Sequence, residues 1–338
     1  MGSFIGSRTA EFTTPPRIIA EAAVVGKKEG EGPLRERFDH IGRDSYFGHK
    51  SWEKAESAML RRCFDIALGK AEMSPATLRY ILAGDLLNQC TGSAFAIRDS
   101  EIPFLGLYGA CSTMGESLGL AAMLVDGGFA ESCCAMTSSH FCSAERQFRL
   151  PLEYGGQRSP TAQWTVTGAG AAIVSARGNG PRISHFTTGK IVDAGICDAG
   201  NMGAAMAPAA LDTLLAHFRD TGRSPEYYDA VITGDLGHFG HAILAELLER
   251  EGLKMPPVFT DCGLLIYNRK HQDTHCGGSG CGCAASVLCG HILKCLREGT
   301  WRRVLFAPTG ALMSPVSSMQ GESIPGICHA LAIEMEGR

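Results

Sequence analysis

The sequence predicts an α/β protein made of two halves of similar plan. Short apolar runs typical of strands alternate with longer segments of helical periodicity along the chain. Two pieces are also duplicated: YILAGDLL (80–87) matches AVITGDLG (230–237), and GACSTMGESLGLAAMLVDGG (109–128) resembles GCGCAASVLCGHILKCLREG (280–299). A duplication with halves of about 170 residues predicts a pseudo-two-fold arrangement of mixed sheets with buried helices between them. We place the boundary at the Asn179-Gly180 turn, between an N-terminal half (1–180) and a C-terminal half (181–338).

The first half opens with a predicted strand at 17–26, followed by a charged turn and a polar, glycine-punctuated loop. A helix is predicted from about Ser51 to Leu68, because apolar residues recur on one face at Ala55, Met59, Cys63 and Ile66. The apolar run 80–89 predicts a strand that reaches Gly-Asp. This places Asp85 at the carboxyl end of a strand, where open α/β sheets collect ligands.

The stretch 105–128 contains the main candidate for a reactive or ligand-binding residue, Cys111. Cys111 precedes Ser112 and Thr113, and a small-residue helix is predicted to begin near Ser112. A thiol at a helix N-terminus feels the positive end of the dipole, which lowers its pKa and favours a nucleophile. The same amides can also hold a carboxylate or phosphate that never reacts, and an inert buried cysteine is a third interpretation.

A small-residue strand from Cys133 to Thr137 follows, and then a polar loop that carries His140, Arg146, Arg149 and Arg158. The glycines in 164–177 predict a strand whose backbone lies in tight contact with a neighbouring helix. The second half repeats the scheme. It has a strand from Arg182, a helix within 201–222, and a strand that enters a loop with His238 and His241 before the next helix.

Composition narrows the class of protein. With 338 residues, 45% of them hydrophobic and 20% charged, the chain can bury a large core. A net charge of −4, a pI near 6.3 and the lack of a Lys/Arg-rich run argue against nucleic acid as a partner. No apolar run has the length of a membrane span and no secretion signal is evident, so we expect a soluble intracellular protein whose 14 cysteines are reduced.

The segment HQDTHCGGSGCGC (271–283) contains soft metal ligands at His271, His275, Cys276, Cys281 and Cys283. Zinc sites usually use paired Cys-x2-Cys or helical histidine spacings, and none of these spacings fits. We therefore expect glycine-rich backbone beside a pocket here, with no bound metal and no cofactor.

Two motifs resemble the thiolase-like superfamily of condensing enzymes: GACSTMGESL at the helix start and TGAGAAIV in the glycine-rich strand. The resemblance implies a thiolase-like fold, with two mixed five-stranded sheets and buried helices in α-β-α-β-α layers, and Cys111 at the nucleophile position. In those enzymes the second half supplies a histidine and an asparagine or second histidine. Alignment places Gly234 and Cys281 at these two positions, which leaves only His238 or His241 as substitutes.

Longer motifs are similar to the stage V sporulation protein AD family, from about residue 17 to the C-terminus. They are RQFRLPLEYGGQRSPTAQWTVTGAGAA, GKIVDAGICDAGNMGAAMAPAALDTL, CGGSGCGCAASV and TGALMSPVSSMQGESIPGICHALAIE. The resemblance implies a protein that keeps the thiolase pocket and binds dipicolinic acid (pyridine-2,6-dicarboxylate) during uptake into the developing spore, with calcium entering only as part of the ligand. It also implies a homodimer, which works beside other proteins of the same spore operon, integral membrane ones included, at the spore inner membrane.

A flat dianion needs donors for two carboxylates and an apolar slot for the ring. The helix start at Cys111, Ser112 and Thr113 offers amides and hydroxyls, and the small residues around Cys281 allow close backbone approach from the other half. Side-chain donors would come from histidines or arginines. The predicted ligand site is therefore drawn from Cys111, Ser112, Thr113, His140, Arg146, Arg149, His238, His275, Gly278, Ser279, Gly280 and Cys281.

Two other functions fit the same residues. A condensing enzyme acting on acyl thioesters would use Cys111 with His238 or His241, and a scaffold for spore membrane partners would need no pocket at all. We expect binding of the ligand without turnover, because the two partner groups that would make Cys111 productive are missing from their aligned positions.

Overall fold

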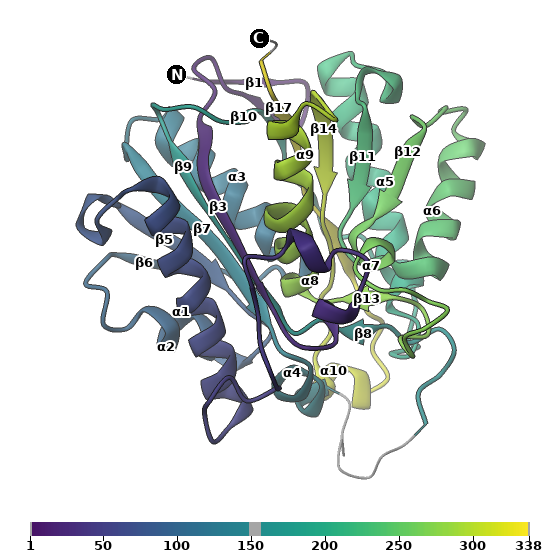
Figure 1. Cartoon of the computed structure of the whole chain (residues 1–338). Coiled ribbons are helices and arrows are strands. Elements are labelled where there is room, and N and C mark those ends of the chain that lie inside the picture. The colour runs from purple at the N-terminus through teal and green to yellow at the C-terminus, as the bar shows by residue number, and fades with distance from the viewer. Residues whose placement is uncertain (1, 149–156, 337–338) are drawn as a thin grey trace.

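The computed structural model describes residues 2–148 and 157–336 of the chain. Within these residues, five strands of each half follow one another in a single hydrogen-bonded order (Figure 1). The first-half strands, from the centre outward, are β3 (Arg17–Val25), β9 (Gly168–Ser175), β7 (Ser132–Ser139), β5 (Tyr80–Gly84) and β6 (Phe104–Gly106). Their second-half counterparts are β10 (Arg182–Thr187), β17 (Ala330–Glu334), β14 (Arg303–Ala307), β11 (Ala230–Thr233) and β12 (Val258–Asp261).

The two sets of strands have the same pairing. In the first half β3, β9 and β7 run antiparallel in turn and β7, β5 and β6 run parallel. In the second half β10, β17 and β14 run antiparallel and β14, β11 and β12 run parallel. Where the sheets meet, β10 and β3 share one residue pair, Arg182 with Arg17. The two halves that the sequence duplication predicted therefore have sheets of the same strand order and direction.

Helices fill three layers around these sheets (Figure 1). The outer layer of the first half is α1 (Trp52–Ala71) with α2 (Thr91–Ile97), and that of the second half is α5 (Met202–Thr221) with α6 (Gly237–Arg250). Between the sheets lie α3 (Thr113–Asp126) and α8 (Cys281–Val287), the latter continuing through a π-helical turn (Leu288–Ile292) into α9 (Leu293–Glu298). The thiolase-like layering predicted from the sequence is confirmed.

Alternation along the strands separates the buried core into three parts. On β5, Leu82 faces the central helices, whereas Ile81 and Ala83 pack against α1. On β14, Phe306 faces the centre and Leu305 packs against the outer helices of the second half. Each sheet is thus apolar on both faces, which explains its continuous apolar runs in sequence.

Shorter elements complete the fold. They are β1 (Ser3–Ile5), β2 (Thr9–Glu11), β4 (His40–Ile41), α4 (Phe141–Phe148), β8 (Trp164–Thr165), α7 (Cys262–Leu265), β13 (Gly278–Ser279), β15 (Thr309–Ala311), α10 (Pro315–Met319) and β16 (Gly326–Cys328). β8 pairs with β13, which connects residues far apart in the chain, and β15 pairs with the nearby β16.

The strand predicted at 80–89 is shorter than expected. β5 ends at Gly84, and Asp85 turns the chain by accepting hydrogen bonds from the backbone N–H groups of Leu87 (2.9 Å) and Ser93 (2.7 Å). The helix predicted to begin at Ser51 does so, with the Ser51 hydroxyl accepting from the Lys54 N–H at its N-cap.

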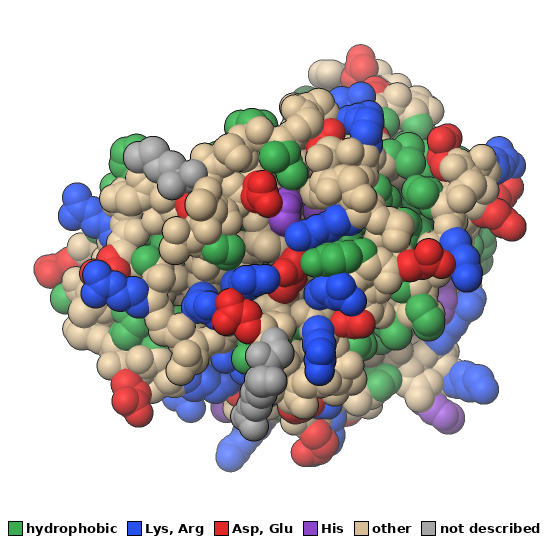
Figure 2. Space-filling view, turned by 90° about the horizontal axis from the view of Figure 1, so that it is seen from above, with side chains coloured by type: hydrophobic (Ala, Val, Ile, Leu, Met, Phe, Trp, Pro, Cys, Tyr) green, Lys and Arg blue, Asp and Glu red, His purple; other side chains and the backbone are tan. Residues whose placement is uncertain are grey.

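Charged side chains of both signs are intermingled on the face that carries the chain ends (Figure 2). Ion pairs near the chain ends include Arg182 of β10 with Glu334 of β17 (3.1 Å) and Arg297 of α9 with Glu21 of β3 (2.7 Å). This face therefore has no extended field of one sign. Across residues 2–148 and 157–336, no helix combines the length and the apolar character needed to cross a bilayer.

The predicted close contact between the glycine-rich strand and a helix is confirmed at Gly170 on β9. A Cβ added there would lie 2.4 Å from the carbonyl oxygen of Ala285 on α8. Because that oxygen belongs to the backbone of a buried helix, it has little freedom to move away.

We predict that Gly170→Ala lowers the free energy of unfolding by about 1–3 kcal/mol, the usual cost of overpacking. Gly69→Ala is the matched control, since nothing lies within 4 Å of an added Cβ at that helical position, and it should stabilise by about 0.5–1 kcal/mol. Urea unfolding would measure both, and equal midpoints for the two variants would contradict the prediction.

Candidate functional site

A small cavity lies beside Cys111, at the start of the central helix of the first half. Its free volume is about 40 Å³. The residues that line it come from both halves of the chain: Leu86, Tyr108, Ala110, Cys111, Phe148, Thr165, Met202, Ser279, Ala311 and Met313. Most are apolar or aromatic, and the polar side-chain groups among them are one thiol and the three hydroxyls of Tyr108, Thr165 and Ser279. This composition is typical of a slot for a ring or an acyl chain.

The helix start is built as predicted, but its hydroxyls already have partners. Ala110–Ser112 form a 3-10 turn that leads into α3. The Ser112 hydroxyl donates to the Gly109 carbonyl (2.7 Å), and the Thr113 hydroxyl donates to the Ala110 carbonyl (2.6 Å). Neither residue lines the cavity, so among the three predicted helix-start residues only Cys111 does.

Backbone of the second half covers this helix start. A Cβ added at Gly310 on β15 would lie 3.2 Å from the Cys111 amide nitrogen, 3.0 Å from that of Ser112 and 2.4 Å from the Gly109 carbonyl oxygen. Only glycine permits this approach. The amides that sequence reasoning offered to an anion therefore lie against protein backbone.

A buried charged group, Asp235, lies behind the cavity wall and comes two residues after the end of β11. Its carboxylate is fully buried and accepts hydrogen bonds from the Ser279 hydroxyl (3.1 Å), the Gly280 N–H (3.2 Å) and the Thr309 hydroxyl (2.9 Å). The Cys111 thiol donates to the same carboxylate. Asp235 thus joins the cysteine of the first half to three residues of the second.

These surroundings keep the Cys111 thiol protonated. Its side chain is 7% exposed, and burial, followed by the charge of Asp235 and the neighbouring Cys281 thiol, raises its pKa well above the ordinary value. The expectation that the helix dipole lowers this pKa is wrong, because desolvation and a buried carboxylate outweigh a partial charge at the helix end.

Gly234 and Cys281, which the alignment placed at the histidine and asparagine positions, serve packing in this structure. A Cβ at Gly234 would lie 2.8 Å from the Pro308 Cα, so no larger side chain fits. The Cys281 thiol donates to the Ser138 carbonyl (3.0 Å). Gly280, with φ of +99°, turns its N–H toward Asp235, and Gly278 and Ser279 form β13.

The predicted histidines do not line the Cys111 cavity. His140 is buried, with Nε2 2.7 Å from the Ser45 carbonyl and Nδ1 accepting from the Cys142 N–H. His238 and His241 lie on α6, where the His241 ring packs on Phe259. His275 lies in the loop before β13, with Nδ1 2.8 Å from the Ser159 carbonyl.

Of the two predicted arginines, Arg146 does not line the cavity. Arg146 forms an ion pair with Glu53 and lies over the Trp52 ring, 5.5 Å from its centroid. Arg149 lies outside the described residues. Of the predicted site, the structure brings Cys111 and Ser279 to the cavity wall and Gly280 to the carboxylate behind it.

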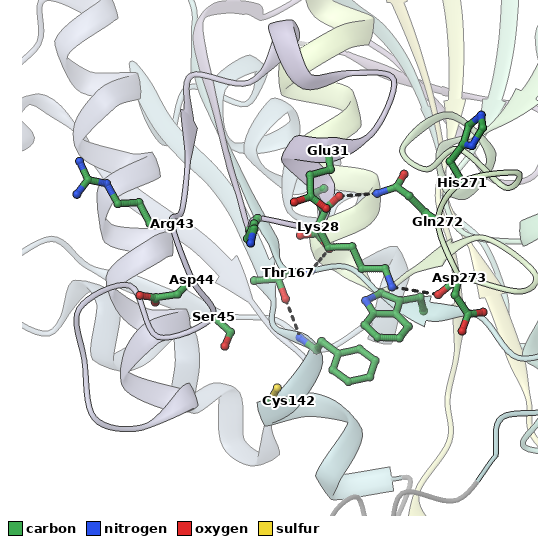
Figure 3. A pocket seen from close by; sticks show the side chains of 15 residues that line it. Lys28, Glu31, Arg43, Asp44, Ser45, Cys142, Thr167, His271, Gln272 and Asp273 are labelled. Atoms are coloured by element: carbon green, nitrogen blue, oxygen red, sulfur yellow. Dashed lines mark hydrogen bonds between the residues drawn. The ribbon is translucent and has the colours of Figure 1, made fainter.

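A larger hollow of about 660 Å³ lies on the opposite face of β8 (Figure 3). Thr165 of β8 points into the Cys111 cavity and the preceding Trp164 lines this hollow. The Lys28 ammonium lies 3.5 Å from the Trp164 ring centroid and donates to the Asp273 carbonyl (3.0 Å), while Phe141 stacks on Trp164 at 3.9 Å. Burial lowers the pKa of Lys28.

The hollow mixes charges of both signs. Lys27, Lys28 and Arg43 line it together with Glu31, Asp44 and Asp273. Sequence reasoning did not predict this site, because its walls come from three distant segments, at 26–45, 141–167 and 271–273. Within the described ranges, no group of three or more His, Cys, Asp or Glu side chains is arranged to hold a metal ion.

Asp235 was also missed as a site residue, although its motif was noticed. It is the aspartate of the duplicated Gly-Asp-Leu, and its counterpart Asp85 is equally buried and close to the buried Glu56. The repeated Gly-Asp-Leu motif at equivalent strand ends could have indicated that both aspartates are functional candidates. Which of them faces Cys111 depends on the packing of one half against the other.

Comparisons with known proteins place the chain in a sequence family and a fold. A family model described as Stage V sporulation protein AD matches residues 6–334. Stage V sporulation protein AD of Bacillus subtilis (strain 168) is 44% identical over 332 residues, which cover 98% of each chain.

Solved structures share the fold at low identity. A 3-oxoacyl-[acyl-carrier-protein] synthase III from Aquifex aeolicus VF5 matches with a TM-score of 0.57 and 13% identity, covering 94% of this chain and 99% of the other. Human mitochondrial 3-ketoacyl-CoA thiolase matches with a TM-score of 0.57 and 12% identity, covering 96% and 99%. At this identity the likeness shows the fold alone.

We predict that Cys111 resists alkylation. At neutral pH, iodoacetamide should modify the exposed Cys197 and leave Cys111 unmodified, because a buried thiol held at high pKa forms little thiolate. Mass spectrometry of tryptic peptides would follow both residues in one sample. Modification of Cys111 at the rate of Cys197 would contradict this account.

Proposed function

Because the chain belongs to the stage V sporulation protein AD family, a sporulation family with a thiolase-like fold, we propose that it binds dipicolinate without turning it over and so supports uptake into the developing spore. The proposed site is the Cys111 cavity. The protein would act beside other proteins of the same operon, including membrane proteins.

One observation carries the choice of binding over catalysis. The Cys111 thiol donates to a buried carboxylate, and none of the described residues that line its cavity is a histidine or an asparagine. A condensing enzyme needs a thiolate and donors for the developing oxyanion. The negative charge of Asp235 disfavours formation of the Cys111 thiolate. It also disfavours an oxyanion in the same cavity.

The lining suits the ring of the ligand. Tyr108, Phe148, Met202 and Met313 offer aromatic and sulfur surfaces, and Thr165 and Ser279 offer hydroxyl donors. A cavity of about 40 Å³ is smaller than the ligand, so binding requires side chains to move. Met202 and Met313 are suited to this, because methionine has three flexible torsions and repacks at little cost.

We predict that dipicolinate binds and that filling the cavity abolishes binding. Ala311→Phe places a ring in the cavity wall, whereas Ala194→Phe is a matched control at an exposed position. Calorimetric titration should give saturable heat for the wild type and the control, and at least tenfold weaker binding for Ala311→Phe. No heat at millimolar ligand would reject the proposal.

The enzyme alternative is tested on the same sample. After incubation with acetyl and malonyl thioesters, intact-mass spectrometry should find no acyl group on Cys111. Stoichiometric acylation would replace the binding proposal with a condensing activity.

We also propose a homodimer that pairs through the edge strand β6. In the described part of the chain this strand pairs on one side only, with β5; Leu105 on the strand and Tyr108 just after it are 41% and 50% exposed. Exposed apolar groups on a free strand edge favour association with another chain.

The wild type should therefore elute with a mass near twice 35.9 kDa in light scattering, and Leu105→Lys should shift it toward the monomer. Met319→Lys on α10, where Met319 is 77% exposed, is the control and should leave the mass unchanged. A monomeric wild type would exclude this interface.

A further inference from the structure

We propose that the exposed surface around α10 is a docking site for a segment of a partner protein that carries apolar side chains flanked by lysine or arginine. This α10 surface consists of residues 314–324, which contain α10, and of the loop 191–201 that runs beside them. It lies at the end of the molecule opposite the chain termini (Figure 1). Its role does not depend on which ligand the Cys111 cavity holds.

Hydrogen bonds hold the two segments of the α10 surface side by side. The Ser323 hydroxyl donates to the Asp193 carboxylate (2.6 Å), and the Ile324 N–H donates to the Ile196 carbonyl (2.8 Å). α10 itself lies in the loop between the paired strands β15 and β16. The surface therefore has a defined shape before a partner binds, which lowers the entropy cost of binding.

Apolar side chains of α10 face solvent. Val316 and Met319 are 65% and 77% exposed, and they lie on one side of the helix because they are three residues apart. None of the residues of α10 is buried. Cys197 of the adjoining loop is also exposed, with its sulfur 3.9 Å from the Gly321 carbonyl oxygen. Exposed apolar groups that gather on one surface favour contact with another molecule, and methionine is enriched at protein interfaces.

The charges around these apolar groups are negative. Asp193, Asp198 and Glu322 are exposed, and the sequence has no lysine or arginine in 191–201 or 309–329. Hydrogen bonds from a side-chain hydroxyl and a backbone N–H lower the pKa of Asp193, so this carboxylate is ionised at neutral pH. The α10 surface thus has an apolar centre and an acidic rim.

This combination identifies the chemistry of the partner. An apolar surface with an acidic rim is complementary to a segment that presents apolar residues together with basic ones. Lys190, which adjoins the loop, pairs with Asp212 (3.1 Å). A bilayer with anionic lipids attracts basic segments and repels acidic ones, and a second copy of this surface would bring like charges together. Both of these alternatives are therefore disfavoured.

The α10 surface adjoins the Cys111 cavity along the chain. Met313 lines that cavity, and α10 begins two residues later. A partner docked on α10 therefore contacts the segment that forms part of the cavity wall.

The test uses the full-length protein and a fluorescently labelled helical peptide of leucine and lysine, which has one apolar and one basic face. Anisotropy should show saturable binding to the wild type. The double variant Val316→Ser, Met319→Ser should bind about tenfold more weakly, because it removes the apolar centre of the interface. Phe129→Ser is the control, since Phe129 is 69% exposed outside the α10 surface, and it should bind as the wild type does. Equal binding by the double variant and the wild type overturns the inference.

The acidic rim is tested with the double variant Asp193→Asn, Glu322→Gln. It should weaken binding of the same peptide about fivefold and reduce the salt dependence, because rim charges are screened by salt. Glu36→Gln, at a side chain 91% exposed on another segment, is the matched control and should have no effect. A peptide with glutamate in place of lysine should bind the wild type about tenfold more weakly. Equal affinity for the two peptides overturns the inference.

Two further measurements identify other occupants. If the wild type sediments with vesicles of phosphatidylglycerol and phosphatidylcholine and the Val316→Ser, Met319→Ser variant does not, the surface binds a membrane and the inference is wrong. If the same variant turns a dimer into a monomer in light scattering, the occupant is a second copy and the inference is also wrong. Unchanged thermal unfolding of the variants, followed by circular dichroism, shows that a loss of binding does not come from misfolding.

Discussion

The hydrogen bonds to the fully buried Asp235 carboxylate connect the two halves of the molecule. The Cys111 thiol comes from the helix start of the first half, and the three other donors come from β13, the turn before α8 and β15 of the second. An ionised carboxylate in the interior is tolerated only when its oxygens are fully hydrogen-bonded. One side chain therefore accepts hydrogen bonds from four separate segments.

Small residues make that convergence possible. Gly310 lets β15 cover the amides at the start of α3, Gly234 lets β11 approach Pro308, and Gly280 adopts a positive φ that directs its N–H to the carboxylate. A Cβ at any of these positions would lie within 3 Å of a neighbouring atom. The glycine-rich motifs that gave the chain its family resemblance are thus explained by backbone contact between the halves.

The site shows how burial can reverse the chemistry that a motif suggests. A cysteine at a helix N-terminus is a common way to stabilise a thiolate. Here the helix end is covered by backbone, and the buried carboxylate of Asp235 places a negative charge beside the thiol. The dipole contributes a partial positive charge only, so the thiol remains protonated and acts as a hydrogen-bond donor. A cysteine at a helix N-terminus can therefore be held as a neutral thiol.

Local pattern in the sequence determined the element types, the duplication and the family, because strand alternation, helical periodicity and long motifs are properties of neighbouring residues. It also placed Cys111 at a helix start and Gly170 against a helix. Only the tertiary structure decided which groups meet there. His140, His238 and His275 lie away from the cavity, whereas Asp235 lies against Cys111, since contacts between segments more than a hundred residues apart depend on how the two sheets pack. The tertiary structure also determines the pKa of the Cys111 thiol. Its burial and its contact with a carboxylate of the other half cannot be inferred from the residues next to it in sequence.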